Sequence, residues 1–227
     1  AFSRPEFVDR AHAEPLVAKT SRTVTDPNRI RARLQELRWM LEELNLPYDV
    51  ELMHFGGNLK SAQYLALNPM GKVPAIQHGD TVVTEGAAIC AYLADQFTDK
   101  GLAPAPDSSD RGTYYRWLFF AAGPLEMVTS AKAFGWSLNA DNAQSVGCGL
   151  YQDTVNALET ALANGPYICG EQFTAADVYV GSHIEWGMMF ETLEPRPAFT
   201  RYVQRLQARK AAIKANELDD ALLKQPA

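Results

Sequence analysis

"GKVPAIQHGDTVVTEGAAICAYLAD", residues 71–95, has the pattern of a β-hairpin that runs directly into a helix. Two short strands are predicted, Ala75–His78 and Thr81–Thr84, and they are rich in β-compatible residues. Gly79 and Asp80 lie between them and form a two-residue turn of the kind that hairpins favour. From Gly86 onward, apolar residues fall at helical spacing, at Ile89, Tyr92, Leu93 and Phe97.

Two residues of this stretch are not explained by the hairpin alone. Pro74 opens the first strand, although a proline has no N–H to donate to a β-ladder. Glu85 stands at the corner between the second strand and the helix. The helix dipole favours an acidic residue there by about 0.3–1 kcal/mol, which is the purely structural interpretation. The alternative is that both residues serve a bound ligand.

The segment before the hairpin alternates strands and helices. Asp26 is a good helix cap, and the apolar spacing that follows it predicts a helix over Pro27–Leu44. "YDVELM", residues 48–53, alternates like a half-buried strand, and Ser61–Leu67 reads as a short helix. A first strand is expected within residues 15–26 at a position that the pattern does not fix. The expected order is therefore β-α-β-α-β-β-α.

After residue 100 the pattern becomes helical. Asp99–Asp110 is rich in Pro, Gly, Ser and Asp and is typical of a linker. Thr174 and Asp177 have the spacing of a capping box that opens a helix. Four helices are expected, over residues 111–134, over 143–165, from 175 onward and over 198–216. The first of them should bend at Gly123-Pro124. We expect a flexible tail over residues 1–14 and domains over 15–100 and 108–227.

Composition excludes several classes of function. The 227 residues carry a formal net charge of −6 and the pI is about 5.3, which argues against a nucleic-acid partner. No stretch has the roughly 18 apolar residues that a membrane span needs. The three cysteines lie far apart without a CxxC pair, and the histidines lack metal-ligand spacing. We expect a cytoplasmic protein with reduced thiols and no metal.

Three stretches together resemble the cytosolic glutathione S-transferase family, in particular its bacterial theta- and beta-like members. "WMLEELNLPYDVEL", residues 39–52, is similar to the family's first helix and second strand. Residues 68–95, "NPMG" followed by the hairpin and helix, are similar to its glutathione-binding segment. "YICGEQFTAADVYV", residues 167–180, resembles its capping motif. The resemblance implies a thioredoxin-like α/β N-terminal domain, an all-α C-terminal domain, a homodimer and a role in detoxification.

The resemblance also implies what Pro74 and Glu85 do. Pro74 would be a cis-proline, and the backbone of Val73 would pair with the cysteine of glutathione as an added strand. Glu85 would accept from the γ-glutamyl ammonium, and the N–H groups beginning at Gly86 would hold the neighbouring carboxylate. Lys72 matches a basic residue that reaches the glycine carboxylate. Glutathione would thus be the co-substrate.

The residue that activates the glutathione thiol is left open by the sequence. The family places a Ser, Tyr or Cys just after the first strand, where a hydrogen bond lowers the thiol pKa. By counting back from the helix, that place falls near Ala32, which has no side-chain donor. Asn28, Ser21 and Thr25 are the catalytic candidates, each with an alternative interpretation as a cap or strand-end residue.

By the same resemblance, the electrophile would lie against the first helix of the helical domain. Tyr114, Trp117 and Phe120 are the expected contacts, although aromatic residues at helical spacing are more often core. The implied reaction is attack of the glutathione thiolate on a small hydrophobic electrophile. Two alternatives stay open: a glutathione-dependent peroxidase or isomerase, and a non-catalytic glutathione-binding or interaction module.

Overall fold

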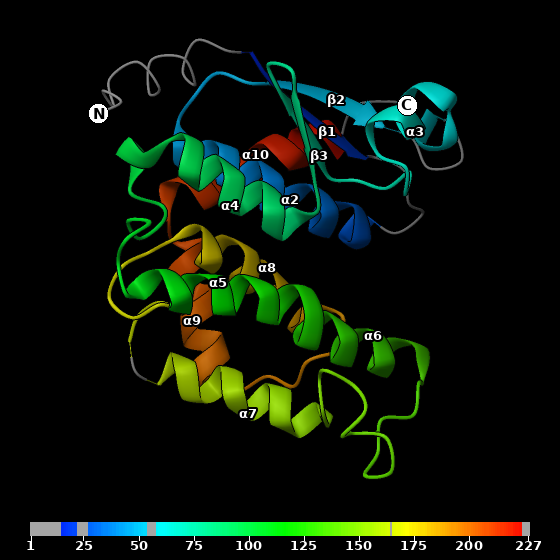
Figure 1. Cartoon of the computed structure of the whole chain (residues 1–227), viewed down its shortest axis with the longest axis vertical. Helices are drawn as coiled ribbons and strands as arrows, with labels where there is room; N and C mark the ends of the chain where they lie inside the picture. Colours follow the sequence, from blue (N-terminus) through cyan, green and yellow to red (C-terminus); the bar gives the residue numbers. More distant parts are fainter. Residues whose placement is uncertain (1–14, 22–26, 54–57, 164, 224–227) are drawn as a thin grey trace. The chain divides into compact units, whose positions relative to one another are not determined.

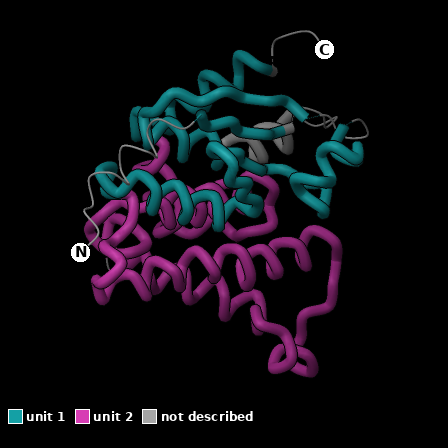
Figure 2. The backbone as a smooth tube through the Cα atoms, turned by 45° about the horizontal axis from the view of Figure 1, so that its top comes forward, with its two compact units in different colours: residues 1–101, 209–227 teal, residues 102–208 magenta. Residues whose placement is uncertain are grey.

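The structure, a computed structural model, describes residues 15–21, 27–53, 58–163 and 165–223. The expected tail, residues 1–14, lies outside these ranges. The chain divides into two compact units (Figure 2). One combines the residues up to Gly101 with the segment from Arg209, and the other runs from Leu102 to Ala208. The first unit holds the sheet and the second is helical, which confirms the predicted fold class.

The first unit is built on a four-stranded mixed sheet in the order β2-β1-β3-β4 (Figure 1). The strands are β1 (Leu16–Ser21), β2 (Asp49–Met53), β3 (Ala75–His78) and β4 (Thr81–Thr84). β1 runs parallel to β2 and antiparallel to β3, and β3 and β4 form the predicted hairpin. The strand that the sequence could not place is therefore a central one, and two of its apolar side chains, Leu16 and Ala18, are buried.

Helices cover this sheet and supply its core. They are α2 (Pro27–Leu44), α3 (Ala62–Leu67), α4 (Gly86–Gln96) and α10 (Lys210–Leu223), with 3₁₀ turns at Asn58–Lys60 and Thr98–Lys100. α2 and α4 pack against the same side of the sheet, and α10 packs against α2 (Figure 1). Leu41 of α2, Ile76 of β3 and Leu93 of α4 are fully buried, as their apolar spacing predicts.

The last predicted helix, residues 198–216, is wrong as a single element. The structure has α9 (Pro197–Gln207) and then α10, separated at Ala208 and Arg209. The N–H of Ala208 still bonds to the carbonyl of Gln204, but the next helix begins only at Lys210. Because α10 buries Ala212, Ala215 and Asp219 against the first unit, it groups with that unit and not with the helical one.

The second unit is a set of helices joined by loops, one of which is as long as residues 135–150. Its helices are α5 (Asp110–Phe120), α6 (Glu126–Phe134), α7 (Tyr151–Leu162), α8 (Ala175–Met189) and α9. A π-helical turn, Ala121–Leu125, joins α5 to α6 at the predicted Gly123-Pro124 interruption. Pro124 has no N–H for the helix ladder, so a local change of hydrogen-bond register is expected there.

The helix predicted over residues 143–165 begins later, at Tyr151. Gly149 has φ +62°, in the left-handed region that ends or precedes helices. The N–H of Leu150 donates to Oδ2 of Asp153 at 2.9 Å, which caps the start of α7. The glycines at 147 and 149 therefore break the helical pattern that the apolar residues before Tyr151 suggest.

The predicted capping box of α8 is confirmed and lies in the core of the helical unit. Asp177 is fully buried and accepts from the N–H of Thr174 at 2.8 Å and of Ile168 at 2.7 Å. The hydroxyl of Tyr202 donates to the same carboxyl at 2.8 Å. Burial raises the pKa of Asp177 to about 6 against the opposing effect of these hydrogen bonds. The box thus ties α8, α9 and the loop before α8 together.

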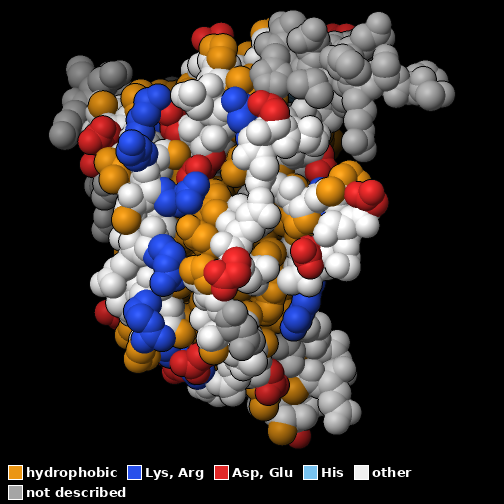
Figure 3. Space-filling model, turned by 90° about the vertical axis from the view of Figure 1, so that its left-hand side faces the viewer, with side chains coloured by type: hydrophobic (Ala, Val, Ile, Leu, Met, Phe, Trp, Pro, Cys, Tyr) orange, Lys and Arg blue, Asp and Glu red, His pale blue; other side chains and the backbone are white. Residues whose placement is uncertain are grey.

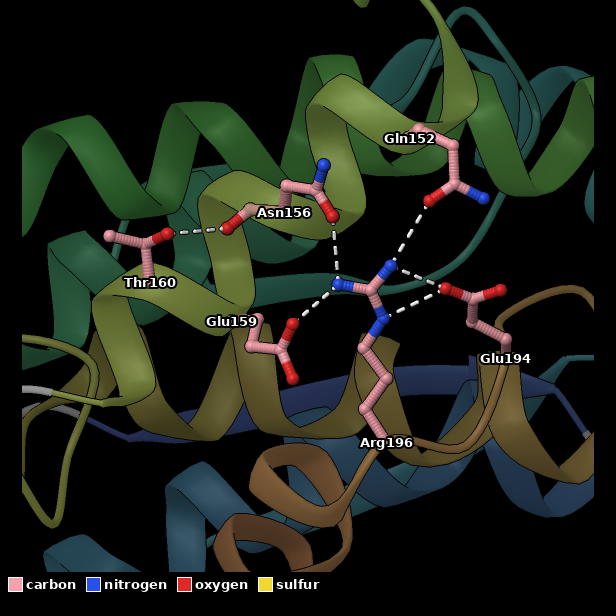
Figure 4. Close-up of polar contacts among 6 residues, drawn as sticks. All are labelled: Gln152, Asn156, Glu159, Thr160, Glu194 and Arg196. Atoms are coloured by element: carbon pink, nitrogen blue, oxygen red, sulfur yellow. Dashed lines mark hydrogen bonds and ion pairs between the residues drawn. The ribbon is translucent and has the colours of Figure 1, made fainter.

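Arg196 makes a second connection, at the surface, between α7 and the segment before α9 (Figure 4). Its Nη1 donates to Asn156 at 2.8 Å and to Glu159 at 2.6 Å, and its Nη2 donates to Gln152 at 3.0 Å. Its Nε donates to Glu194 at 2.8 Å. Exposed ion pairs contribute about 0–1 kcal/mol each, so this network orients elements more than it stabilises them.

The surface carries both charged and apolar side chains. Figure 3 shows hydrophobic side chains exposed between lysines, arginines and acidic residues on one face. In the described part of the chain, no helix combines the length and the apolar character that a bilayer crossing requires. Cys90, Cys148 and Cys169 are free cysteines.

Candidate functional site

The segment Lys72–Pro74 leads into β3 and has the geometry that the sequence predicts. The Val73–Pro74 peptide bond is cis, as expected. Pairing of β3 with β1 and with β4 starts only at Ala75, so Val73 stands just outside the ladder. In the described ranges, the N–H and C=O of Val73 have no backbone partner in the protein. An extended chain can therefore pair with Val73 by strand addition.

The strand registers bring the backbones of two other predicted site residues, Gly86 and Ser21, to this same end of the sheet. Ala75 pairs with Thr84, so continuing the hairpin register places Gly86 level with Val73. Ala75 also pairs with Lys19 of β1, so the backbone of Ser21 reaches the same level. The end of β1, the cis-proline segment and the start of α4 therefore meet at one end of the sheet.

Glu85, at this end of the sheet, has an unusual backbone conformation. Its φ is +68° and its ψ is 121°, although it is not glycine. Its carbonyl accepts from the N–H of Ile89 at 2.9 Å, but its exposed side chain makes no capping bond to α4. Such conformations cost about 1–3 kcal/mol and concentrate at ligand-binding sites. An exposed carboxylate beside the first N–H groups of a helix offers an acceptor and donors to one ligand.

The loop before Val73 is held by residues that the sequence analysis did not single out. The hydroxyl of Tyr64 and Nδ2 of Asn68 donate to the Lys72 carbonyl, at 2.6 and 2.9 Å. Gly71 has φ +58°, and a Cβ there would lie 2.7 Å from the carbonyl oxygen of Leu59. The glycine of "NPMGKVP" is therefore required sterically. The Asn-Pro that ends α3 is the sequence signal for this turn.

The structure does not decide the catalytic candidates. Thr25 lies outside the described residues. Ser21 is the last residue of β1 and Asn28 the second residue of α2, but their side chains are not described. The assignment of Ser21, Thr25 or Asn28 as the thiol-activating residue stays a prediction.

The three predicted electrophile contacts lie on or next to the core side of α5. Tyr114 and Trp117 are buried, whereas Phe120 is partly exposed. The rings of Trp117 and Phe120 meet edge to face, with centroids 5.2 Å apart. Tyr114 therefore packs as core in this structure, and substrate contact by any of the three remains a prediction. Across the described ranges, no group of three His, Cys, Asp or Glu side chains could hold a metal ion.

Two family models match the chain in the regions just described. The model of the N-terminal domain of glutathione S-transferases matches residues 34–96, which include the cis-proline segment, the hairpin and the start of α4. The model of the C-terminal domain of the same enzymes matches residues 143–205, which include the capping box.

Individual relatives agree with these matches. The chain is 32% identical to the glutathione S-transferase GstA of Escherichia coli O157:H7 over 70% of this chain and 76% of that protein. A glutathione transferase structure from Methylococcus capsulatus superposes with a TM-score of 0.71 at 26% identity, covering 90% of this chain and 99% of the other. A structure of a Phanerochaete chrysosporium glutathione transferase in complex with oxidized glutathione also has a TM-score of 0.71. Its sequence identity is 23%, and the similarity covers 93% of this chain and 99% of the other. The last similarity concerns the fold alone.

Proposed function

This chain belongs to the glutathione S-transferase family, and from that premise we propose that it conjugates glutathione to small hydrophobic electrophiles. The observation that carries the proposal is the meeting of Val73, Gly86 and the end of β1 at one end of the sheet. In this arrangement one short peptide can meet an unpaired strand edge, a helix start and a carboxylate together.

Each part of glutathione has a partner in this proposal. The N–H and C=O of Val73 pair with the cysteine backbone, and the carboxylate of Glu85 accepts from the γ-glutamyl ammonium. The N–H groups at Gly86 hold the γ-glutamyl carboxylate, and the exposed ammonium of Lys72 reaches the glycine carboxylate. Two charges of the ligand are thus opposed by two charges of the protein, and peptide pairing fixes the register.

The reaction is nucleophilic attack by sulfur. A free thiol has a pKa of about 8.5, so a donor that stabilises the thiolate raises the reactive fraction at neutral pH. The thiol proton passes to solvent, a C–S bond forms at the electrophilic carbon, and the leaving group departs with its electron pair. Ser21, Thr25 and Asn28 are the proposed donors, and Tyr114, Trp117 and Phe120 belong to the helix on the electrophile side.

The active form is proposed to be a cytoplasmic homodimer. Large apolar side chains are exposed along α5 and α6, at Tyr115, Phe119, Met127 and Phe134. Phe119 is 70% and Phe134 is 71% exposed, and an exposed apolar row of this kind is a feature of association surfaces. Sedimentation equilibrium tests the proposal: Phe119→Asp should shift the chain toward the monomer, whereas the exposed control Thr113→Asp should not.

Glutathione titration by calorimetry tests the binding site. Glu85→Gln should weaken binding by about 10- to 150-fold, since a charged hydrogen bond is worth about 1.5–3 kcal/mol. Asp80→Asn is the matched control, because Asp80 is an exposed acid in the turn at the other end of the same hairpin. Equal binding by all three proteins would refute the role of Glu85, and absence of binding by the unmodified chain would refute the function.

Thiol activation is tested separately, by following the ultraviolet absorbance of the bound thiolate against pH. In the unmodified complex the thiol pKa should lie clearly below about 8.5. One of Ser21→Ala, Thr25→Val or Asn28→Ala should return it toward that value. Binding with an unshifted thiol would instead identify a glutathione-binding module without transferase chemistry.

A further inference from the structure

The carbonyl of Lys72 is held from inside the protein by two side chains. Tyr64 Oη donates to it at 2.6 Å and Asn68 Nδ2 at 2.9 Å. Both side chains are buried, with 2% and 3% of their surface exposed. A backbone carbonyl that accepts two side-chain donors is fixed in direction more firmly than the rest of the loop.

This fixed carbonyl determines where the next N–H points. The peptide group between Lys72 and Val73 is planar, with its C=O and N–H on opposite sides. Since the carbonyl points inward to Tyr64 and Asn68, the N–H of Val73 points the other way. That N–H is one of the two backbone groups to which the proposed function assigns the cysteine of glutathione.

We propose that Asn68 is a positioning residue that aims the Val73 N–H at the bound peptide. The inference rests on the proposed function and adds a residue that does not touch the ligand. Asn68 acts through the Lys72 carbonyl, and Tyr64 supports it from α3. Without Asn68, the peptide plane between Lys72 and Val73 can rotate, and the strand edge presented to glutathione is lost.

The chemistry of the site requires an amide at position 68. Oδ1 of Asn68 accepts from the N–H of Met70 at 3.0 Å, while Nδ2 donates to the Lys72 carbonyl. The backbone carbonyl of Asn68 also accepts from the N–H of Gly71 at 2.8 Å. One side chain must therefore supply an acceptor and a donor three atoms from the backbone, which asparagine does and aspartate does not.

Tyr64 keeps the proton that it donates to the Lys72 carbonyl. Burial raises the pKa of its phenol, so the hydroxyl keeps its proton at all physiological pH values. Its proton is directed at the Lys72 carbonyl, and the hydroxyl has no competing acceptor among the contacts described for it. Removing this hydroxyl takes away one donor to the Lys72 carbonyl and also the hydrogen bond between the phenol and the Asn68 side chain.

Two variants and one matched control isolate the effect. Asn68→Asp keeps the acceptor for Met70 but replaces the donor by an oxygen that faces the Lys72 carbonyl. Tyr64→Phe removes the second donor, together with the hydrogen bond between the phenol and the Asn68 side chain. Lys60→Met is the control, because Lys60 Nζ donates at 2.8 Å to the carbonyl of Met70, in the same loop but in another peptide group.

Two measurements are made on each full-length variant. The first is the dissociation constant of glutathione by calorimetry, together with KM and kcat for glutathione with an activated aryl chloride. The second is the amide resonance and hydrogen exchange of Val73 in the ligand-free protein by NMR. Only the first depends on glutathione, so failure of the proposed function and failure of the positioning role are distinguishable.

Asn68→Asp should raise the dissociation constant and KM about tenfold or more, and Tyr64→Phe about three- to tenfold, as expected for one lost hydrogen bond. kcat at saturating glutathione should stay within about twofold, because the lost interaction stabilises the ground state and the transition state equally. The Val73 amide should shift and exchange faster in both variants, whereas Lys60→Met should match the unmodified chain.

Three results would overturn the proposal. The first is an unchanged resonance and exchange rate of the Val73 amide in Tyr64→Phe. If Asn68→Asp does not fold, this result alone overturns the proposal. The second is an equal loss of affinity in Lys60→Met, which would assign the effect to the loop in general. The third is glutathione affinity within twofold of the unmodified chain in both variants, provided that this chain binds.

Discussion

Arg38 of α2 donates through Nε to the carboxylate of Asp219 on α10, a residue 181 positions further along the chain. Both side chains are buried, and that of Asp219 is completely so. The carboxylate and the hydroxyl of Tyr48 also raise the pKa of the guanidinium against the opposing effect of burial. The pair connects α10 to α2 within the first unit.

Asp219→Ala should lower the free energy of unfolding by about 3–5 kcal/mol, because it leaves the charge of Arg38 buried without its partner. Urea denaturation followed by circular dichroism measures the change. Glu217→Ala, an exposed carboxylate on the same helix, is the control and should stay within about 0.5 kcal/mol. A loss as small as that of the control would mean that Arg38 finds another partner.

Glu85→Gly should stabilise the protein while weakening glutathione binding. Glycine adopts φ +68° without the steric cost that a Cβ brings, so the free energy of unfolding should rise by about 1 kcal/mol. Thermal denaturation and calorimetry on one preparation measure both quantities. Glu85→Gln keeps the Cβ and should weaken binding without the gain in stability. Destabilisation by glycine would show that the corner is not strained.

His183 should make stability depend on pH on the acid side. Burial lowers the pKa of His183 from 6.5 to about 4, against a hydrogen bond to the Tyr179 carbonyl. The native state therefore resists protonation between these values while the unfolded state takes up a proton. The contribution is complete above pH 6.5 and is lost as pH falls toward 4, by about 1–3 kcal/mol.

Urea denaturation of the unmodified chain and of His183→Gln between pH 4 and pH 7 isolates this effect. The difference in unfolding free energy between the two proteins should change with pH over the window from 6.5 to about 4. The raised pKa of Asp177 acts in the opposite direction in both proteins and cancels in the difference. A difference independent of pH would contradict the neutral state of the partly buried His183.

Asp177→Ala should destabilise the helical unit more than any single surface change. It removes the acceptor of two backbone N–H groups, those of Ile168 and Thr174, and of the Tyr202 hydroxyl. Each buried donor left unpaired costs about 1–3 kcal/mol, so a total loss of about 3 kcal/mol or more is expected. Urea denaturation tests this against the exposed control Glu171→Ala.

Where the sequence carried local chemistry, prediction succeeded. The helix predicted from Pro27 begins there, and Gly79-Asp80 forms the predicted hairpin turn, because helix starts and tight turns depend on a few neighbouring residues. The capping box at Thr174 and Asp177 belongs to the same class. The cis-proline prediction needed the family resemblance, since Val-Pro alone does not specify the isomer.

Features that depend on contacts formed only in the folded chain could not be predicted from the sequence. Nothing near Ala208 signals that α9 and α10 separate, because the break follows from where each helix finds its core. The bonds of Tyr64 and Asn68 to the Lys72 carbonyl join residues eight and four positions apart through a turn whose shape only the fold supplies. The glycines before Tyr151 did indicate a later start of α7, but the apolar pattern was given more weight in the prediction.

The grouping of α10 with the first unit also bears on synthesis at the ribosome. Chains emerge from their N-terminus, and domains generally fold as units during translation. The segment from Leu102 to Ala208 is contiguous and can complete its fold as soon as it has emerged. The unit that carries the sheet cannot, because α10 is synthesised only after the whole of the other unit. The second unit to be encoded is therefore the first that can finish folding.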